Sequence, residues 1–192
     1  MNGIEARGLT VRRGFATLFR DLAFRVGEGE CLAVRGPNGS GKTTLLRCAA
    51  GLTRADAGEV TRSGALLYAG HLPGIKDDLT AEENLRGALA LRGCPASADA
   101  IREALGEAGL GKRRMLPARR LSAGQRRRIG LARLMLDPAP LWILDEPLTA
   151  LDDEGCALFS RLAGAHLDRG GVMLAATHHD LAAARTRELR LA

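Results

Sequence analysis

The sequence predicts an α/β domain built on a mixed sheet core, with an antiparallel β layer at the N-terminus and a helical subdomain. Residues 4–12 and 18–26 alternate apolar and polar side chains, which is typical of half-buried antiparallel strands. Short apolar runs at 141–144 and 172–176 are typical of strands in the centre of a parallel sheet. Between residues 79 and 135 the pattern is mostly helical.

The length fits a single domain. At 192 residues the chain lies within the rough guide of ~100 to 200 residues for each domain, and no repeat, low-complexity tract or linker divides it. We therefore expect one domain over residues 1–192, with a helical subdomain inserted at about 72–135.

Composition excludes several classes of protein. With 46% hydrophobic and 26% charged residues, the chain is expected to be globular rather than disordered or fibrous. No apolar run approaches the ~20 residues of a membrane-spanning helix, and the N-terminus is too polar for a signal peptide. The cysteines lie far apart without a C-x-x-C pair, which favours neither a zinc site nor a disulfide framework. We expect a soluble, cytosolic protein with reduced thiols.

The net charge of +6 leaves three kinds of anionic partner open: nucleic acid, an acidic membrane surface or an anionic small ligand. Aromatic residues make up only 3% of the chain, too few for the stacking platforms of a single-strand or RNA binder. Basic residues concentrate at 112–128, which we interpret as a solvated face with one or two anion contacts. Nucleic acid is therefore not the expected partner.

A glycine-rich turn carries the first chemical motif. Residues 36–43 fit the pattern G-x-x-x-x-G-K-[ST] and lie between an apolar strand at 30–35 and a helix that starts at Lys42. Glycines let the backbone wrap closely around phosphates, so that its N–H groups and the helix N-terminus face them. Lys42 would add positive charge at the β- and γ-phosphates, and the Thr43 hydroxyl would ligate Mg²⁺. The expected nucleotide-binding residues of this loop are Gly36, Pro37, Asn38, Gly39, Ser40, Gly41, Lys42, Thr43 and Thr44.

Capping residues locate several helix ends. The helix that starts at Lys42 is expected to end near Ala50, because Gly51 stops it. Thr80 heads the segment TAEENL as an N-cap with a capping box, and residues 93–95 break the helical pattern that follows. The middle of the chain is therefore expected to hold several helices rather than one.

A strand that ends in two carboxylates carries the second motif. The segment LWILDE ends at Asp145 and Glu146, and Trp142 within it is assigned to the core. Asp145 would hold Mg²⁺ through its water shell, and Glu146 would orient or deprotonate the attacking water. An apolar strand followed by Asp-Glu is common on its own. Its presence in the same chain as the phosphate loop is what favours the catalytic interpretation.

A third motif, LSAGQ, immediately precedes a helix and comprises Leu121, Ser122, Ala123, Gly124 and Gln125. Ser122 can cap that helix, whose free N–H groups and dipole would create an anion site distinct from the phosphate loop. By itself this is only a capped helix start. Its place in the order of motifs decides its interpretation.

In this set and order, the motifs resemble those of the ATP-binding cassette (ABC) ATPases, a type of P-loop NTPase. The phosphate loop GPNGSGKTT, the signature LSAGQ, the strand LWILDEP, the stretch LTALD and the stretch THHD carry the resemblance, which covers essentially the whole chain. It implies a homodimer in which two chains sandwich two ATP molecules with Mg²⁺. Each ATP would be bound by one chain's phosphate loop and the other chain's signature.

The resemblance also implies roles for single residues. Lys42, Glu146 and His178 would be catalytic, with His178 in contact with the γ-phosphate. Asp152 would link the two ATP sites. The neighbouring His179 is the alternative to His178, and both His179 and His166 are otherwise expected at the surface.

Two positions depart from the family pattern. His71 stands where most cassettes have a glutamine, and we expect it to act on the metal through a bound water, because Mg²⁺ prefers oxygen ligands. Arg13 stands where an aromatic residue usually stacks on adenine, with Phe15 nearby. The planar guanidinium of Arg13 can stack on a base, and a surface arginine is the alternative interpretation.

Within the family, the short chain and the stretch LYAGHLPGIK resemble the ATP-binding subunits of cytochrome c maturation transporters, the haem exporter or CcmA type. The resemblance implies a peripheral protein on the cytoplasmic face of the bacterial inner membrane. There, ATP hydrolysis would drive an integral membrane partner of the CcmB type, with the CcmC type as a second candidate. The alternatives are the ATPase of a lipid or lipoprotein exporter and, further off, a nucleotide-dependent nucleic-acid-binding ATPase. The sequence leaves open whether haem itself is transported.

Overall fold

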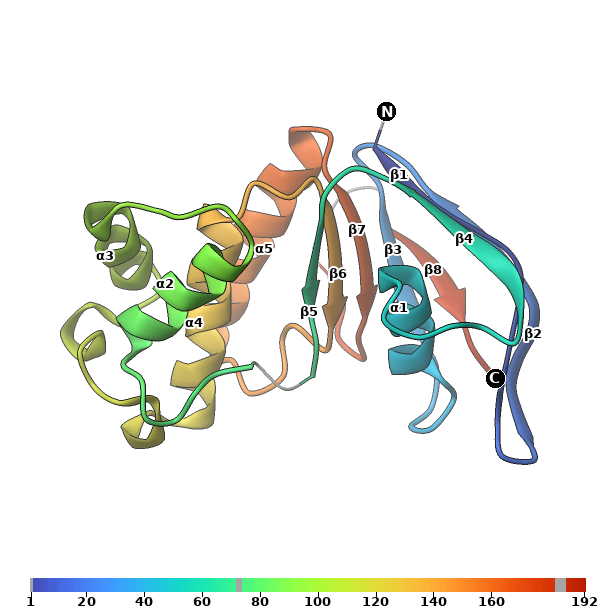
Figure 1. Cartoon of the computed structure of the whole chain (residues 1–192), viewed down its shortest axis with the longest axis horizontal. Coiled ribbons are helices and arrows are strands. Elements are labelled where there is room, and N and C mark those ends of the chain that lie inside the picture. Colours follow the sequence, from blue (N-terminus) through green and yellow to red (C-terminus); the bar gives the residue numbers. More distant parts are fainter. Residues whose placement is uncertain (1, 72–73, 182–185) are drawn as a thin grey trace. The chain divides into compact units, whose positions relative to one another are not determined.

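The computed structural model describes residues 2–71, 74–181 and 186–192, and the chain divides into two compact units (Figure 1). The first, which we call the sheet unit, comprises Met1–His71, Ala139–Pro147 and Ala163–Ala192. The second, the helical unit, comprises Leu72–Pro138 and Leu148–Leu162. Within the described residues, no helix is both long enough and apolar enough to cross a bilayer.

The sheet unit contains two sheets with α1 (Lys42–Ala50) packed between them (Figure 1). The antiparallel sheet has the strand order β2 (Ala16–Val26), β1 (Gly3–Arg13), β4 (Ala57–Ser63). The parallel sheet has the order β5 (Leu66–Ala69), β6 (Leu141–Asp145), β7 (Val172–Ala176), β3 (Cys31–Arg35), β8 (Thr186–Arg190). The expected mixture of antiparallel and parallel pairing is thus divided between two sheets, and the α/β fold class is confirmed.

Burial patterns explain why these segments are strands. Every residue of β6 and β7 is buried, as expected for central strands that are covered on both faces. In β1, Ile4, Leu9 and Val11 point into a core shared with Leu45 and Leu46 of α1. Both leucines are 0% exposed, so α1 is held by apolar contacts that join it to the two sheets.

The register of the parallel sheet brings three strand ends to one edge. Val34 pairs with Ala176, and Ala176 pairs with Asp145, so β3, β7 and β6 end side by side. Ligands of open α/β sheets bind outside the carboxyl ends of the strands. The residues that follow β3, β6 and β7 are therefore the ones placed to do chemistry.

The helical unit is built from short capped helices. It holds α2 (Ala81–Leu91), α3 (Ala98–Glu107), the 3-10 helices η1 (Gly111–Arg113) and η2 (Ala118–Arg120), α4 (Ala123–Leu136) and the first part of α5 (Asp153–Asp168). Thr80 and Glu83 form the expected capping box of α2, and the backbone N–H of Thr80 holds the pKa of Glu83 below its usual value. Ser122 caps α4, as expected.

A buried ion pair joins the ends of α2 and α4. The Asp137 carboxylate is 0% exposed and accepts from Arg92 Nε at 2.9 Å and from Arg92 Nη2 at 3.2 Å. Arg133 Nε lies 3.8 Å from the same carboxylate, and burial lowers the pKa of Arg133. Because a buried carboxylate is costly without partners, this cluster fixes how the two helices end.

Most of the expected elements are confirmed. The helix at Lys42–Ala50 ends at Gly51, whose φ of 75° places it in the left-handed region that favours glycine. Three strands were not predicted: β4, β5 and β8. β4 and β8 are largely exposed, so neither shows the apolar signature of a central strand.

The expectation that His166 lies at the surface was wrong. His166 is 6% exposed, and its ring stacks on Trp142 with centroids 3.8 Å apart and planes 10° from parallel. Trp142 is 2% exposed, as its assignment to the core requires. Gly171 makes room for the ring, because a Cβ there would lie 2.4 Å from His166 Nε2. Burial lowers the pKa of His166.

This burial predicts a pH dependence of stability. Above the ordinary histidine pKa of ~6.5, His166 is neutral in both the folded and the unfolded chain. As pH falls through that value, the unfolded chain takes up a proton that the folded chain resists, so the free energy of unfolding falls. We expect His166→Phe, which keeps a stacking ring, to lose less stability than the parent between pH 7.5 and 5.5 in urea unfolding. Equal losses would contradict this.

Candidate functional site

The phosphate loop connects β3 to α1 and depends on glycine. Gly36, Gly39 and Gly41 have φ values of 149°, 87° and 97°. A Cβ at Gly36 would lie 2.6 Å from the Leu191 carbonyl oxygen, so no larger residue fits there without displacement. The N-cap residue of α1 is Gly41, which offers no side-chain acceptor to the first turn. The N–H groups of this turn therefore suit an anion.

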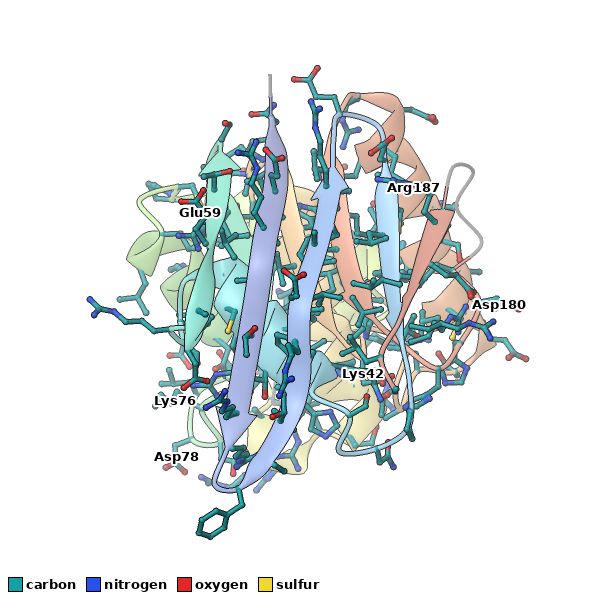
Figure 2. All side chains as sticks on the ribbon, turned by 90° about the vertical axis from the view of Figure 1, so that its right-hand side faces the viewer. Lys42, Glu59, Lys76, Asp78, Asp180 and Arg187 are labelled. Carbon is teal, nitrogen blue, oxygen red and sulfur yellow. The ribbon has the colours of Figure 1, made fainter. Side chains whose placement is uncertain are left out.

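Lys42 lies over the loop that precedes it. Its Nζ donates to the carbonyl oxygens of Gly36 at 2.8 Å and Pro37 at 3.0 Å, and the residue is only 8% exposed. Figure 2 labels Lys42 near the start of α1. A partly buried ammonium held at a glycine-rich turn is a strong attractor for phosphate oxygens.

Thr43 and Asp145 bring two oxygen ligands together. The Thr43 hydroxyl donates to Asp145 Oδ2 at 2.9 Å, and Asp145, the last residue of β6, is 2% exposed. A hydroxyl and a carboxylate are the oxygen donors that Mg²⁺ prefers. No group of three or more His, Cys, Asp or Glu side chains suited to a metal occurs among the described residues. A cation here would therefore need further oxygens from water or a nucleotide.

Glu146 and His178 meet at the same edge of the sheet. His178 Nε2 lies 3.5 Å from Glu146 Oε1, and their side chains are 50% and 15% exposed respectively. Glu146 has a φ of 51°, a left-handed conformation that is costly for a non-glycine residue, and its N–H donates to the Ala176 carbonyl at 2.8 Å. Backbone pairing with β7 thus fixes the direction of the Glu146 side chain.

The signature residues lie in the helical unit at the start of α4. Ser122 Oγ accepts from the Gln125 N–H at 3.2 Å, and Gln125 Oε1 accepts from the Ser122 N–H at 3.1 Å. A Cβ at Gly124 would lie 2.6 Å from the Ala150 carbonyl oxygen, which excludes a side chain. Leu121 is buried and Ala123 is exposed. The motif is therefore a tightly packed, fully capped turn.

A cavity of about 370 Å³ opens at this turn. It is lined by Gly109, Arg113, Ser122, Gly124, Gln125, Arg128, Ala150, Asp152 and Glu154. Arg113 and Arg128 come from the basic run at 112–128, and a helix N-terminus beside two arginines favours an anion. The sequence predicted a solvated face with one or two anion contacts for this run, but it did not predict which arginines would line the cavity.

Asp152 is held within the helical unit by two donors. The Gly155 N–H donates to Asp152 Oδ1 at 3.0 Å, and Arg128 pairs with the same oxygen. These donors, the Gly155 N–H first, lower the pKa of Asp152. Arg128 also donates to the Ala108 carbonyl at 3.0 Å. Arg128 thus ties the expected inter-site residue to the helix that follows the signature.

The remaining predicted residues lie in exposed positions. Arg13 ends β1, and Phe15 is fully exposed in the turn to β2. Leu18 of β2 packs against the phosphate loop, since its Cβ lies 3.1 Å from where a Cβ at Gly41 would be. His71 is exposed and follows β5, next to residues 72–73, which lie outside the described residues.

Comparison with known proteins agrees with this geometry. A family model described as ABC transporter matches residues 19–149. The cytochrome c biogenesis ATP-binding export protein CcmA of Nitrosomonas europaea is 48% identical over 93% of this chain and 89% of its own length. CcmA of Pseudomonas aeruginosa is 44% identical over 98% of each chain. The chain belongs to the CcmA family of ABC transporter ATP-binding proteins.

Solved structures agree with the fold of this CcmA-family chain. A putative ABC transporter ATP-binding protein from Pyrococcus furiosus superposes with a TM-score of 0.85 at 22% identity, covering 98% of this chain and 97% of that one. A dimeric ATP-binding cassette bound to ADP and Pi gives a TM-score of 0.81 at 23% identity, with 98% and 94% covered. As a member of this family of ATPases, the chain binds and hydrolyses ATP.

Proposed function

We propose that the chain is the energy-coupling ATPase subunit of a CcmAB-type complex that serves cytochrome c biogenesis and haem export. The observation that carries the chemistry is the edge of the parallel sheet where the phosphate loop, the Thr43–Asp145 pair and the Glu146–His178 pair lie together. The assignment to cytochrome c biogenesis rests on the CcmA relatives, which match nearly the whole chain.

Each step of hydrolysis has a candidate residue. Backbone N–H groups of the phosphate loop and Lys42 bind the β- and γ-phosphates of ATP. Thr43 and Asp145 would hold Mg²⁺, which neutralises charge that develops on the phosphates. Glu146 accepts a proton from the water that attacks the γ-phosphorus as the bond to the β-phosphate oxygen breaks. His178, beside Glu146, contacts the γ-phosphate.

The second anion site completes the function in a homodimer. The cavity at Ser122 and Gly124 carries a helix N-terminus and two arginines but no phosphate loop of its own. We assign it to the γ-phosphate of an ATP bound by the phosphate loop of a second chain. Asp152, held by Arg128 at the same cavity, would then link the two ATP sites.

The membrane partner is proposed to be of the CcmB type, with the CcmC type as a second candidate. The chain would work as a peripheral protein on the cytoplasmic face of the bacterial inner membrane. A nucleic-acid partner is disfavoured, because several arginines of the basic run are neutralised within the helical unit. Arg119 pairs with Asp78, Arg126 pairs with Asp77 at 2.9 Å, and Arg128 pairs with Asp152.

The proposed mechanism separates binding from hydrolysis. Glu146→Gln keeps the shape of the side chain but cannot act as a base, so ATP should still bind while hydrolysis falls by roughly 100-fold or more. Lys42→Ala should instead weaken ATP binding, because a charge that faces the phosphates is lost. Equilibrium binding and phosphate release measured on both variants test this. Parent-like hydrolysis by Glu146→Gln contradicts the assigned base.

The same Glu146→Gln variant tests the biological role. In bacteria that lack their own CcmA, the parent chain should restore covalent haem in c-type cytochromes, and Glu146→Gln should not. Haem-stained gels of periplasmic cytochromes measure the outcome. A parent chain that hydrolyses ATP but leaves cytochrome c maturation unrestored would favour the runner-up, an exporter of lipid or lipoprotein.

The signature should act only on the other chain's nucleotide. A dimer that mixes Lys42→Ala with Gly124→Asp carries both lesions in one composite site and neither in the other. Mixed dimers should therefore recover part of the hydrolysis that either homodimer has lost. Differently tagged chains, purified in tandem before the assay, measure this. Absence of recovery in proven mixed dimers counts against the shared site.

His71 is proposed to act on Mg²⁺ through a bound water. Loss of a residue that orients a metal's water typically costs roughly 10-fold in metal affinity or more. His71→Ala should therefore raise the Mg²⁺ concentration that gives half-maximal hydrolysis, and His71→Gln should restore it. A magnesium titration of the two variants and the parent decides the matter. Identical titrations leave His71 without a role in metal binding.

A further inference from the structure

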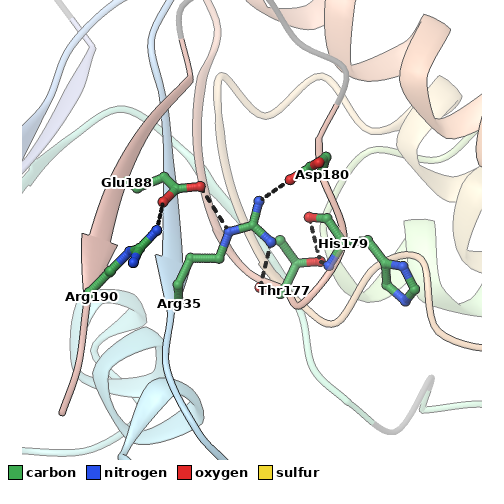
Figure 3. A network of polar contacts seen from close by, with 6 residues as sticks. All are labelled: Arg35, Thr177, His179, Asp180, Glu188 and Arg190. Atoms are coloured by element: carbon green, nitrogen blue, oxygen red, sulfur yellow. Dashed lines mark hydrogen bonds and ion pairs between the residues drawn. The ribbon is translucent and has the colours of Figure 1, made fainter.

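Arg35 joins three segments at the carboxyl edge of the parallel sheet (Figure 3). It is the last residue of β3 and directly precedes the phosphate loop. Its Nη2 donates to Asp180 Oδ1 at 2.8 Å, its Nη1 to the Thr177 carbonyl at 3.5 Å and its Nε to Glu188 Oε1 at 3.2 Å. Two of these acceptors lie in the segment after β7, and the third lies in β8.

The geometry suits an arginine. The Arg35 side chain is only 16% exposed, and its planar guanidinium presents separate N–H donors in fixed directions. A lysine ammonium is a single point charge and cannot present this fork. Backbone pairing fixes where the side chain starts, because Arg35 pairs with Arg190 of β8 and the Thr177 N–H donates to the Val34 carbonyl at 3.3 Å.

The segment that Arg35 contacts carries His178. Thr177 Oγ1 accepts from the His179 N–H at 3.0 Å, so the chain turns tightly as it leaves β7. Arg35 touches this turn on both sides of His178, at the Thr177 carbonyl and at the Asp180 carboxylate. His178 Nε2 in turn lies 3.5 Å from Glu146 Oε1. Arg35 therefore holds the chain just before and just after His178, which itself lies beside Glu146.

We propose that Arg35 is a positioning residue for ATP hydrolysis, which holds residues 177–180 so that His178 stays beside Glu146 and faces the γ-phosphate. This inference rests on the role of His178 in the proposed function. Stability alone does not account for the network, because Asp180 is fully exposed and an exposed partner adds little to folding. The value of the contacts lies in the direction they give to the His178 turn.

The test compares two arginines replaced by the same residue. Arg35→Gln should lower kcat on the order of tenfold, while KM and the Kd for ATP stay within about twofold, because the phosphate loop is untouched. Arg35→Lys should fall between parent and Arg35→Gln. Arg187→Gln is the matched control. Arg187 lies nearer the amino end of β8 than Arg190 does (Figure 2). It pairs with Glu30, and its loss should leave kcat unchanged.

A double-mutant cycle links the effect to His178. If Arg35 acts through His178, the variant Arg35→Gln/His178→Ala should hydrolyse ATP no more slowly than His178→Ala alone. Trapping of ADP with vanadate, which mimics the transferring phosphate, should weaken in Arg35→Gln, while ADP binding alone stays at the parent level. A role confined to folding would instead multiply the two losses in the double variant, and it would lower ADP binding together with vanadate trapping, because both need folded protein.

Three outcomes overturn the inference: a loss of ATP affinity at unchanged kcat, full multiplication of the two single effects in the double variant, or equal kcat in Arg35→Gln and Arg187→Gln. If Arg35→Gln fails to fold, Asp180→Asn takes its place, since Asp180 is exposed. Its kcat should fall, and a parent-like kcat overturns the inference. A His178→Ala variant that hydrolyses ATP like the parent refutes instead the proposed role of His178.

Discussion

The parallel pairing of β3, β6 and β7 is the constraint on which the site depends. Val34, Ala176 and Asp145 stand in register across the sheet, so the phosphate loop, the carboxylate pair and the His178 turn all begin at one edge. Because side chains alternate between the faces of a strand, a slip by one residue would turn Asp145 away from Thr43. The sheet thus sets the distances among groups that lie far apart in sequence.

Packing on both faces of the central strands supports this register, since every residue of β6 and β7 is buried. Leu45 and Leu46 of α1 are fully buried between the two sheets, and truncation of such a side chain typically costs about 2–5 kcal/mol. A well-packed scaffold of this kind can hold strained backbone. The left-handed conformations of Glu146 and Ala150 occur in the segment after β6, where the chain leaves the sheet unit for the helical unit.

Local sequence signals predicted the elements whose formation is local. Gly51 ends α1 and Ser122 caps α4, because each acts on backbone groups within a few residues. The sequence failed where the deciding contact is distant. The buried ring of His166 stacks on Trp142, and Arg35 of β3 meets Asp180 in the segment that follows β7. β8 was missed for the same reason, since pairing with β3 rather than apolar burial makes it a strand.

Charged groups of the phosphate-loop site and of the signature cavity already have partners within the chain. Lys42 donates to two loop carbonyls, Asp145 accepts from Thr43, and Asp152 accepts from Arg128. Lys42 and Asp145 are buried, and unpaired charges at such depth would cost several kcal/mol each, so their contacts let the phosphate-loop site exist before ligand arrives. Binding is then an exchange of partners: phosphate oxygens are stronger acceptors for an ammonium than carbonyls are. The loop can therefore be preformed and still gain from ATP, so one arrangement of the loop can serve a site that fills and empties in each cycle.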